Sequence, residues 1–208
     1  MCAALPFGLS SAPRIFTKVM RQFVAHLRQH MVRVLPYLDD FLFITQSQTK
    51  AAALSEVIDQ LLQSLGLQRN TSKGYWTPTQ SLTHLGMQIT TNPPSITVTA
   101  ATRGRISRFS QDILHLATRR QRMVPRTMLQ RFTGLVISQW LAVPIARGHT
   151  RALYDALARS HSNKCRLHTA ALTELRFWAS DAWAHCAPLR PIRPTWCVET
   201  DASGQAWE

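Results

Sequence analysis

Residues 32–47 read "VRVLPYLDDFLFITQS", with two adjacent aspartates between two apolar runs. The runs are rich in β-branched and aromatic residues and the break between them is short, which predicts an antiparallel hairpin with Asp39 and Asp40 in its loop. Adjacent carboxylates repel each other, and apolar neighbours strengthen the repulsion by lowering the local dielectric constant. Two interpretations follow: a plain turn, in which aspartate is common, or a site where a bound cation offsets the repulsion.

The charge of the whole chain limits its partners. The 208 residues include 24 Lys and Arg against 11 Asp and Glu, a formal net charge of +13, so we expect a nucleic-acid partner. An acidic membrane surface is the rival, but no basic amphipathic anchor, lipidation signal or apolar run of roughly 20 residues is present. The N-terminus lacks the basic region of a secretory signal. We therefore predict an intracellular protein, in the cytoplasm or nucleus, with no membrane partner.

The cysteines do not point to a disulfide framework or a zinc site. Cys2, Cys165, Cys186 and Cys197 are scattered along the chain. The pair of Cys165 with His168 has metal-like spacing but no second matching pair. Reduced thiols are the prediction.

Hydrophobic periodicity predicts an α+β fold. A first helix is expected after Ser10 or Ser11, with Pro13 in its first turn and one apolar stripe formed by Ile15, Phe16, Val19, Met20, Phe23, Val24 and Leu27. A second amphipathic helix is expected up to Gly66, a typical helix stop, with a buried side formed by Leu54, Val57, Ile58, Leu61, Leu62 and Leu65. Short strands are expected within residues 67–80, 81–91 and 95–100, the last two joined through residues 92–94.

Arginine dominates the next part of the chain. Residues 103–131 contain one acid, Asp112, and eight arginines, namely 103, 105, 108, 119, 120, 122, 126 and 131. Apolar residues at helical spacing predict that these arginines decorate a helix, followed by helices from Pro125 towards Trp140 and near residues 150–160 and 167–185. A solvated basic face would explain the arginines, but soluble faces usually mix signs. Contacts with nucleic-acid phosphates are therefore the preferred interpretation.

Several motifs resemble those of reverse transcriptases. The segment "LPFGLSSAPRIFTK" at residues 5–18 resembles that family's L-P-x-G loop, which leads through S-x-P into a helix, and "YLDD" at residues 37–40 resembles its Y-x-D-D hairpin. The segment "GLQRNTSKGYWTPTQ" resembles the one that supplies a lysine near the incoming nucleotide, and "LTHLGMQI" resembles the primer grip. The segment "VETDASGQAW" resembles the first strand of ribonuclease H. The layout is most similar to retrotransposon polyproteins of the DIRS-like group and their pararetrovirus and LTR-element relatives.

The resemblance implies a chemistry and a role for each matching residue. The family joins a primer 3′-hydroxyl to the α-phosphate of a dNTP with two Mg²⁺ ions, for which Mn²⁺ can substitute, and carboxylates are suitable ligands for these hard cations. The implied metal ligands are Asp39 and Asp40 in the polymerase and Asp201 in ribonuclease H. The implied nucleotide and template contacts are Phe7, Gly8, Tyr37 and Leu38, and Lys73 is the implied proton donor to pyrophosphate. The implied primer grip is Leu85, Gly86 and Met87, and the implied backbone contacts are Arg103, Arg105, Arg108, Arg119, Arg120 and Arg122.

Two of these roles have a plain structural alternative: Lys73 as a solvated surface lysine, and Leu85–Gly86 as part of an ordinary strand. The implied partners are an RNA template, a DNA primer, the RNA–DNA hybrid and a dNTP. The implied domains are a partial palm with the primer-grip hairpin at residues 1–100, a helical thumb or connection at 101–187, a linker at 188–194 and the start of ribonuclease H at 195–208.

The family also has a third metal-binding aspartate and the fingers before the L-P-x-G loop. We expect the 208 residues to be a fragment that is inactive alone. Two alternatives to polymerase function remain at this point: a catalytically dead nucleic-acid-binding remnant of a retroelement, and an interaction protein whose basic face binds acidic partners.

Overall fold

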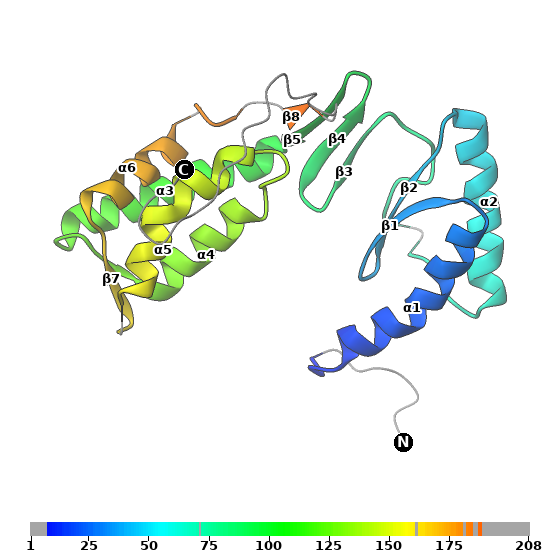
Figure 1. Ribbon diagram of the computed structural model, residues 1–208, viewed down its shortest axis with the longest axis horizontal. Helices are drawn as coiled ribbons and strands as arrows, with labels where there is room; N and C mark the ends of the chain where they lie inside the picture. The colour runs from blue at the N-terminus through cyan, green and yellow to red at the C-terminus, as the bar shows by residue number, and fades with distance from the viewer. Residues whose placement is uncertain (1–7, 71, 161, 181, 185–186, 189–208) are drawn as a thin grey trace, which may run out of the picture. The chain divides into compact units, whose positions relative to one another are not determined.

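The computed structural model describes residues 8–70, 72–160, 162–180, 182–184 and 187–188. The chain divides into two compact units, Met1–His84 and Leu85–Glu208. Each contains helices and a small antiparallel sheet (Figure 1). The predicted α+β class is confirmed.

The first unit is built from two helices and a hairpin. Its elements are α1 (Ala12–Gln29), β1 (Arg33–Tyr37), β2 (Asp40–Ile44), α2 (Gln48–Ser64) and, at its end, β3 (Ser81–His84). The N-terminus of α2 is capped by Ser47, whose side chain accepts a hydrogen bond from the Lys50 N–H at 3.2 Å. Ser11 is the N-cap residue of α1 but makes no side-chain cap bond.

Both helices of this unit end in the same motif. The Leu67 N–H donates to the Leu62 carbonyl at 2.9 Å, across Gly66 at φ 67°. This is a Schellman motif, in which the residue after the cap adopts the left-handed conformation. The prediction that Gly66 stops the helix is therefore confirmed. In α1 the equivalent position is occupied by Met31, at φ 59°.

The core of the first unit lies between the helices and the hairpin (Figure 1). Its buried side chains are Met20, Phe23, Val24 and Leu27 of α1, Val34 of β1 and Ile58 of α2. The predicted stripe of α1 is only partly covered, because Ile15 is 40% exposed and Val19 56% exposed. The same correction applies to α2, where Val57 and Leu65 are exposed rather than buried.

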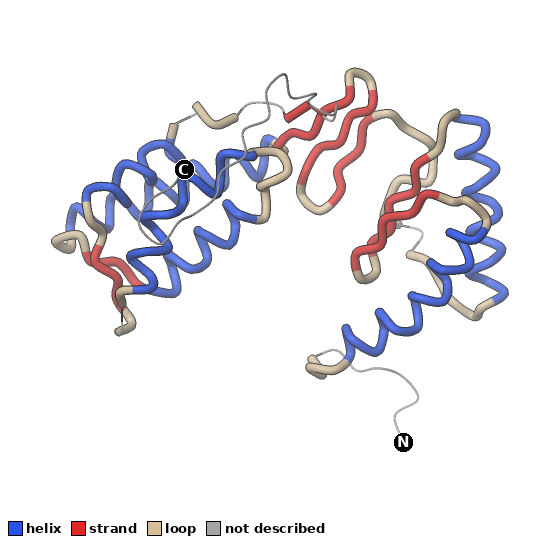
Figure 2. Tube along the Cα trace, viewed as in Figure 1, coloured by secondary structure: helices blue, strands red, loops and turns tan. Residues whose placement is uncertain are grey.

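The second unit is mainly helical, and Figure 2 shows its helices packed side by side. Its elements are β4 (Met87–Thr91), β5 (Pro94–Val98), α3 (Ala100–Arg119), β6 (Met123–Pro125), α4 (Arg126–Ile137), the 3₁₀ helix η1 (Pro144–Thr150), α5 (Arg151–Ala158), β7 (Lys164–Arg166), α6 (Thr169–Ala179) and β8 (Ala187–Pro188). Strand β5 pairs antiparallel with β4 and with β8, and β6 pairs antiparallel with β7.

One apolar core joins the helices of the second unit. Its fully buried side chains include Ile106, Ile113, Leu129, Phe132, Val136, Leu153, Leu175 and Trp178. The Trp178 indole N–H donates to the His149 carbonyl at 2.7 Å, which satisfies the polar atom of this buried ring. Ser110 of α3 is fully buried and its hydroxyl donates to the Leu175 carbonyl of α6.

The predicted elements differ from the observed ones in several places. The described residues of the range 67–80 form no strand, because the Asn70 side chain accepts bonds from both the N–H and the hydroxyl of Ser72 and forms a local turn. The segment 81–91 is two strands, because Leu85 and Gly86 form a turn within it. Strands β6 and β7 are too short to show an alternating pattern, and the last helix ends at Ala179 rather than near His185.

No helix of the described segments is both long and apolar enough to cross a membrane. Apart from Pro188, the predicted linker and the predicted start of ribonuclease H lie outside the described residues. The domain boundaries given for the palm and thumb stay predictions.

The second unit's core makes a direct stability prediction. Replacing the fully buried Leu129 with alanine should lower the free energy of unfolding by about 2–5 kcal/mol, because the substitution leaves a cavity. The same substitution at Leu141, which is 43% exposed, should cost less than about 1 kcal/mol. Urea titration followed by tryptophan fluorescence measures both, since Trp178 and Trp183 lie in this core. Equal losses in the two variants would contradict the assigned packing.

Candidate functional site

The β1–β2 hairpin places two carboxylates side by side. Its loop consists of Leu38 and Asp39, while Asp40 is the first residue of β2 and pairs with Tyr37. The prediction that Asp39 and Asp40 form the loop is therefore wrong by one residue. Leu38 takes the left-handed conformation at φ 53°, as the first position of a two-residue hairpin turn requires. Bulky residues rarely adopt this conformation, and such local strain is concentrated at functional sites.

The register of the hairpin separates a face that packs against the helices from a face that is largely exposed. Val34 pairs with Phe43, and both belong to the core beneath the helices, as does Phe41. Since side chains alternate along a strand, Asp40 lies on the face opposite Phe41. Tyr37 and Leu38 are 56% and 45% exposed next to the carboxylates. The predicted nucleotide contacts Tyr37 and Leu38 are thus accessible beside the predicted metal ligands.

Neither carboxylate is engaged by another side chain or backbone group of the described residues. Asp39 and Asp40 are exposed, and no hydrogen bond or ion pair within the described part of the chain involves their side chains. Four free carboxylate oxygens suit a hard cation such as Mg²⁺. Within the described residues, however, no group of three or more His, Cys, Asp and Glu could hold a metal ion. The hairpin therefore fits part of a magnesium site and needs further ligands to complete one.

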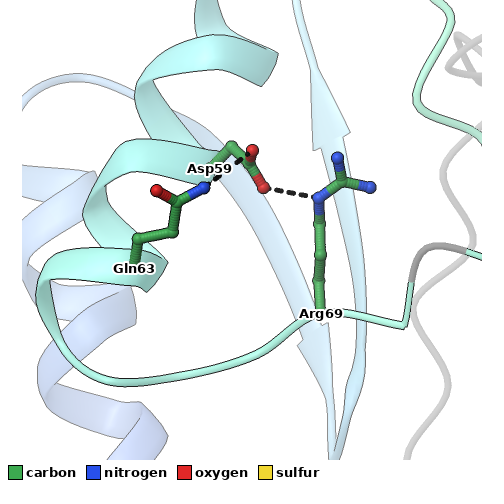
Figure 3. Close-up of polar contacts among 3 residues, drawn as sticks. All are labelled: Asp59, Gln63 and Arg69. Carbon is green, nitrogen blue, oxygen red and sulfur yellow. Dashed lines mark hydrogen bonds and ion pairs between the residues drawn. The ribbon is translucent and has the colours of Figure 1, made fainter.

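The segment that carries Lys73 is held against α2 (Figure 3). Asp59 forms an ion pair with Arg69 and also accepts a bond from the Gln63 amide at 3.3 Å. The Arg69 guanidinium lies 4.2 Å from the centre of the Trp76 ring, a cation–π contact. Lys73 is exposed between these anchors, and no ion pair engages its ammonium group in the described residues. Both interpretations of Lys73 stay open.

Gly8 occupies a backbone conformation suited to glycine. Its φ is 89°, and no heavy atom lies within 4 Å of the position that a Cβ would take. Only glycine adopts this conformation without strain, which leaves the backbone open to close approach. Phe7 and Asp201 lie outside the described residues.

The predicted primer grip is a tight turn. Leu85 and Gly86 have φ of 50° and 77°, the combination of a type I′ turn, so this segment is not an ordinary continuous strand. Met87 is 6% exposed and belongs to the second unit's core. Beside the turn lies Gln139, 3% exposed, whose amide nitrogen is 3.7 Å from the position of a Gly86 Cβ. Gln139 follows the last turn of α4, and no pattern in the sequence predicted its burial beside the turn.

The predicted arginine contacts form two groups along α3. Arg103, Arg105 and Arg108 are exposed in its first half, and Arg119, Arg120 and Arg122 are exposed at and just beyond its C-terminus. At 1.5 Å per residue the groups are roughly 16 Å apart along the helix. Arg126, by contrast, is partly buried and donates to the carbonyls of Leu157 and Ser160, both at 2.7 Å. Its role is structural.

Comparison with known proteins supports the resemblance of the first unit. Residues 2–89 match the family model of reverse transcriptase (RNA-dependent DNA polymerase). This match covers the hairpin, the Lys73 segment and the Leu85–Gly86 turn, and it confirms the predicted resemblance for that part of the chain. A search of curated proteins gave no match.

Solved structures support the fold across both units. The chain is similar to a foamy viral protease-reverse transcriptase in complex with double-stranded DNA, with a TM-score of 0.63 and 20% identity over 89% of this chain. A second structure of the foamy viral protease-reverse transcriptase, in complex with an RNA/DNA hybrid, has a TM-score of 0.65 and 21% identity over 89% of this chain. The chain spans 29% and 23% of the lengths of these two proteins.

Two glycines of the second unit give opposite predictions for one substitution. Gly86→Ala should lower the free energy of unfolding by about 1–2 kcal/mol, because alanine is strained at φ 77°. Gly104→Ala, inside α3 with only the flexible end of Arg108 nearby, should raise it by about 0.5–1 kcal/mol. Thermal unfolding by circular dichroism measures both. An unchanged or higher stability for Gly86→Ala would contradict the turn.

The free carboxylates predict weak metal binding. Substoichiometric Mn²⁺ should broaden the amide NMR signals of residues 37–41, with an affinity on the order of millimolar, because two carboxylates leave most of the coordination shell to water. The double variant Asp39→Asn/Asp40→Asn should lose this broadening. The matched control Asp112→Asn/Asp155→Asn removes two other exposed carboxylates and should retain it. Tight stoichiometric binding by the 208-residue chain would contradict the incomplete site.

Proposed function

We propose that this chain is the catalytic-hairpin and thumb portion of an RNA-directed DNA polymerase with an attached ribonuclease H, which copies retroelement RNA into DNA. The observation that carries the proposal is a pair of carboxylates on a two-residue hairpin, with no partner among the described residues, within the segment that matches the reverse transcriptase family model. The ribonuclease H part and the DIRS-like, pararetrovirus or LTR-type origin rest on the resemblance of the sequence motifs. Because the chain spans less than a third of the structures it matches, the activity is assigned to a longer protein.

Residues of the hairpin and of the rest of the first unit would have separate roles in nucleotidyl transfer. Asp39 and Asp40 would supply oxygen ligands for Mg²⁺, and when bound, two such ions stabilise the attacking and leaving oxygens. The exposed side chains of Tyr37 and Leu38 would contact the primer end and the new base pair. Lys73 would donate a proton to the departing pyrophosphate. Gly8 would let the backbone approach the templating pair closely.

The hairpin also indicates where further ligands would join. A two-residue loop is closed by a hydrogen-bonded pair, Tyr37 with Asp40, so the next pair, Pro36 with Phe41, is the non-hydrogen-bonded type. The backbone nitrogen of Pro36 therefore faces away from β2, on the outer edge of β1. Because proline has no N–H, this edge lacks one hydrogen-bond donor for a further strand. The outer edge of β2 contains no proline and lacks no donor. We infer that a strand carrying the third carboxylate pairs with β2.

Nucleic acid is the proposed partner of the second unit. The foamy viral structures contain double-stranded DNA and an RNA/DNA hybrid. The exposed arginines of α3 would contact the phosphates of an RNA–DNA duplex without reading its sequence. The turn at Leu85 and Gly86 would contact the primer strand.

A second candidate is a nucleic-acid-binding remnant without catalysis. The formal net charge of +13 and the exposed arginines favour binding whether or not the hairpin is active. The two candidates differ in whether the longer protein extends a primer and needs the hairpin carboxylates to do so.

Primer extension on an RNA template separates these candidates. The 208-residue chain with Mg²⁺ or Mn²⁺ should not extend the primer, because two carboxylates from one turn cannot fix two ions. A form lengthened upstream to include the strand beside β2 should extend it, and the same form with Asp39→Asn/Asp40→Asn should lose at least about 10³-fold in rate, as expected for removal of metal catalysis. The lengthened form with Asp112→Asn/Asp155→Asn is the control and should retain activity. Absence of extension by the lengthened form would reject the polymerase proposal in favour of the remnant, and equal extension rates with and without the hairpin carboxylates would reject their role as catalytic metal ligands.

A further inference from the structure

The β6–β7 ribbon brings together two basic segments that are far apart in the sequence. Met123 pairs with Arg166 and Pro125 with Lys164, and the Leu167 N–H donates to the Arg122 carbonyl at 2.8 Å. Figure 2 shows this ribbon at one end of the helical unit. The pairing places Lys164 and Arg166 next to the chain that leaves the C-terminus of α3.

Two adjoining cavities flank the ribbon. The first, of about 440 Å³, is lined by Met123, Ala156, Arg159, Ser160, Ser162, Lys164, Arg166 and His168. The second, of about 320 Å³, shares Met123 and Lys164 with the first and adds Arg120, Val124 and Pro125. Cationic side chains line both cavities, and no acidic residue of the described segments lines either. The shared residues make the basic lining continuous from one cavity to the next.

No ion pair among the described residues neutralises the positive charge of these cavities. Arg120, Arg159, Lys164 and Arg166 are exposed, and none forms an ion pair within the described segments. The nearby guanidinium of Arg126 binds two carbonyls, of Leu157 and Ser160, and forms no ion pair in the part of the chain that the structure describes. Like charges that line the same cavity repel each other, so an anion bound among them would be stabilised.

The polar uncharged groups of the first cavity are used within the protein. The Ser160 hydroxyl lies 2.8 Å from the Lys164 carbonyl, and the Ser162 hydroxyl lies 3.0 Å from the same oxygen. Both hydroxyls thus hold the turn before β7 and are not free to donate to a base edge. Recognition here would depend on charge, with the partly exposed Met123 as an apolar surface for a sugar.

We propose that the two cavities form a binding site for the phosphate backbone of a nucleic-acid strand, separate from the polymerase hairpin. A continuous basic path fits a row of phosphates better than one isolated anion. The site involves Arg159, Lys164 and Arg166, which lie beyond the arginine-rich span of the sequence. It goes beyond the proposed polymerase function, and because its test measures binding, its failure would leave the primer-extension result unaffected.

The test compares two double charge reversals in the full 208-residue chain. The ribbon variant is Lys164→Glu/Arg166→Glu, and the control is Arg151→Glu/Arg176→Glu. Both variants replace exposed residues of the second unit and change the net charge by the same amount. Fluorescence anisotropy with labelled single-stranded RNA and RNA–DNA duplex measures affinity across a salt series. The ribbon variant should bind at least about tenfold more weakly, and its slope of log affinity against log salt concentration should become smaller by about two. The affinity of the control should change less than about threefold. Equal losses in the two variants would overturn the site.

Two further measurements cover misfolding and small anions. Crosslinking of 4-thiouridine RNA to the unmodified chain, mapped by mass spectrometry, should label the residues that line the cavities, and its absence there would overturn the site without relying on a variant. Tripolyphosphate at the same total phosphate concentration should compete poorly with RNA. If it competes equally well, the cavities bind small anions only and the strand proposal is wrong.

Discussion

The pairing of Tyr37 with Asp40 closes the β1–β2 hairpin. It also determines which side chains of the two strands point towards the helices. In this register Val34 and Phe43 enter the core formed with Phe23 and Ile58. A shift by one residue would exchange the two faces of a strand and turn Asp40 towards that core. Burying an unpaired carboxylate is costly, so the apolar side chains and the carboxylates favour the same register. The packing of the first unit thereby fixes the position of its candidate site.

In the second unit the length of α3 determines where the exposed arginines lie. Its buried face, with Ile106 and Ile113, packs in the core, and its exposed arginines are distributed to its two ends. One group follows the β4–β5 hairpin and the other precedes the β6–β7 ribbon. Basic side chains near the turn at Leu85–Gly86 in sequence would serve the polymerase site, and those at the ribbon would serve the proposed strand site. A helix of 20 residues can separate two binding surfaces that a short one would merge.

Much of this could be predicted from the sequence, because the decisive patterns are local. The aspartates between two apolar runs predicted the hairpin, Gly66 predicted a helix end, and the spacing of apolar residues predicted α1, α2 and α3. The errors have physical causes: Asn70 forms a turn that breaks an apparent strand, and β6 and β7 are too short to show periodicity. Lys164 and Arg166 were missed because only strand pairing brings them to Arg122. Gln139 was missed because its burial beside Gly86 depends on tertiary packing.

The central claim is that Asp39 and Asp40 belong to the metal site of a polymerase. Electron paramagnetic resonance can count bound Mn²⁺ in the upstream-lengthened protein with primer, RNA template and a non-hydrolysable dNTP. The account predicts two ions per protein, and less than one in the Asp39→Asn/Asp40→Asn variant of the same complex. Two bound ions in both proteins would show that the hairpin carboxylates are not metal ligands and would contradict the account.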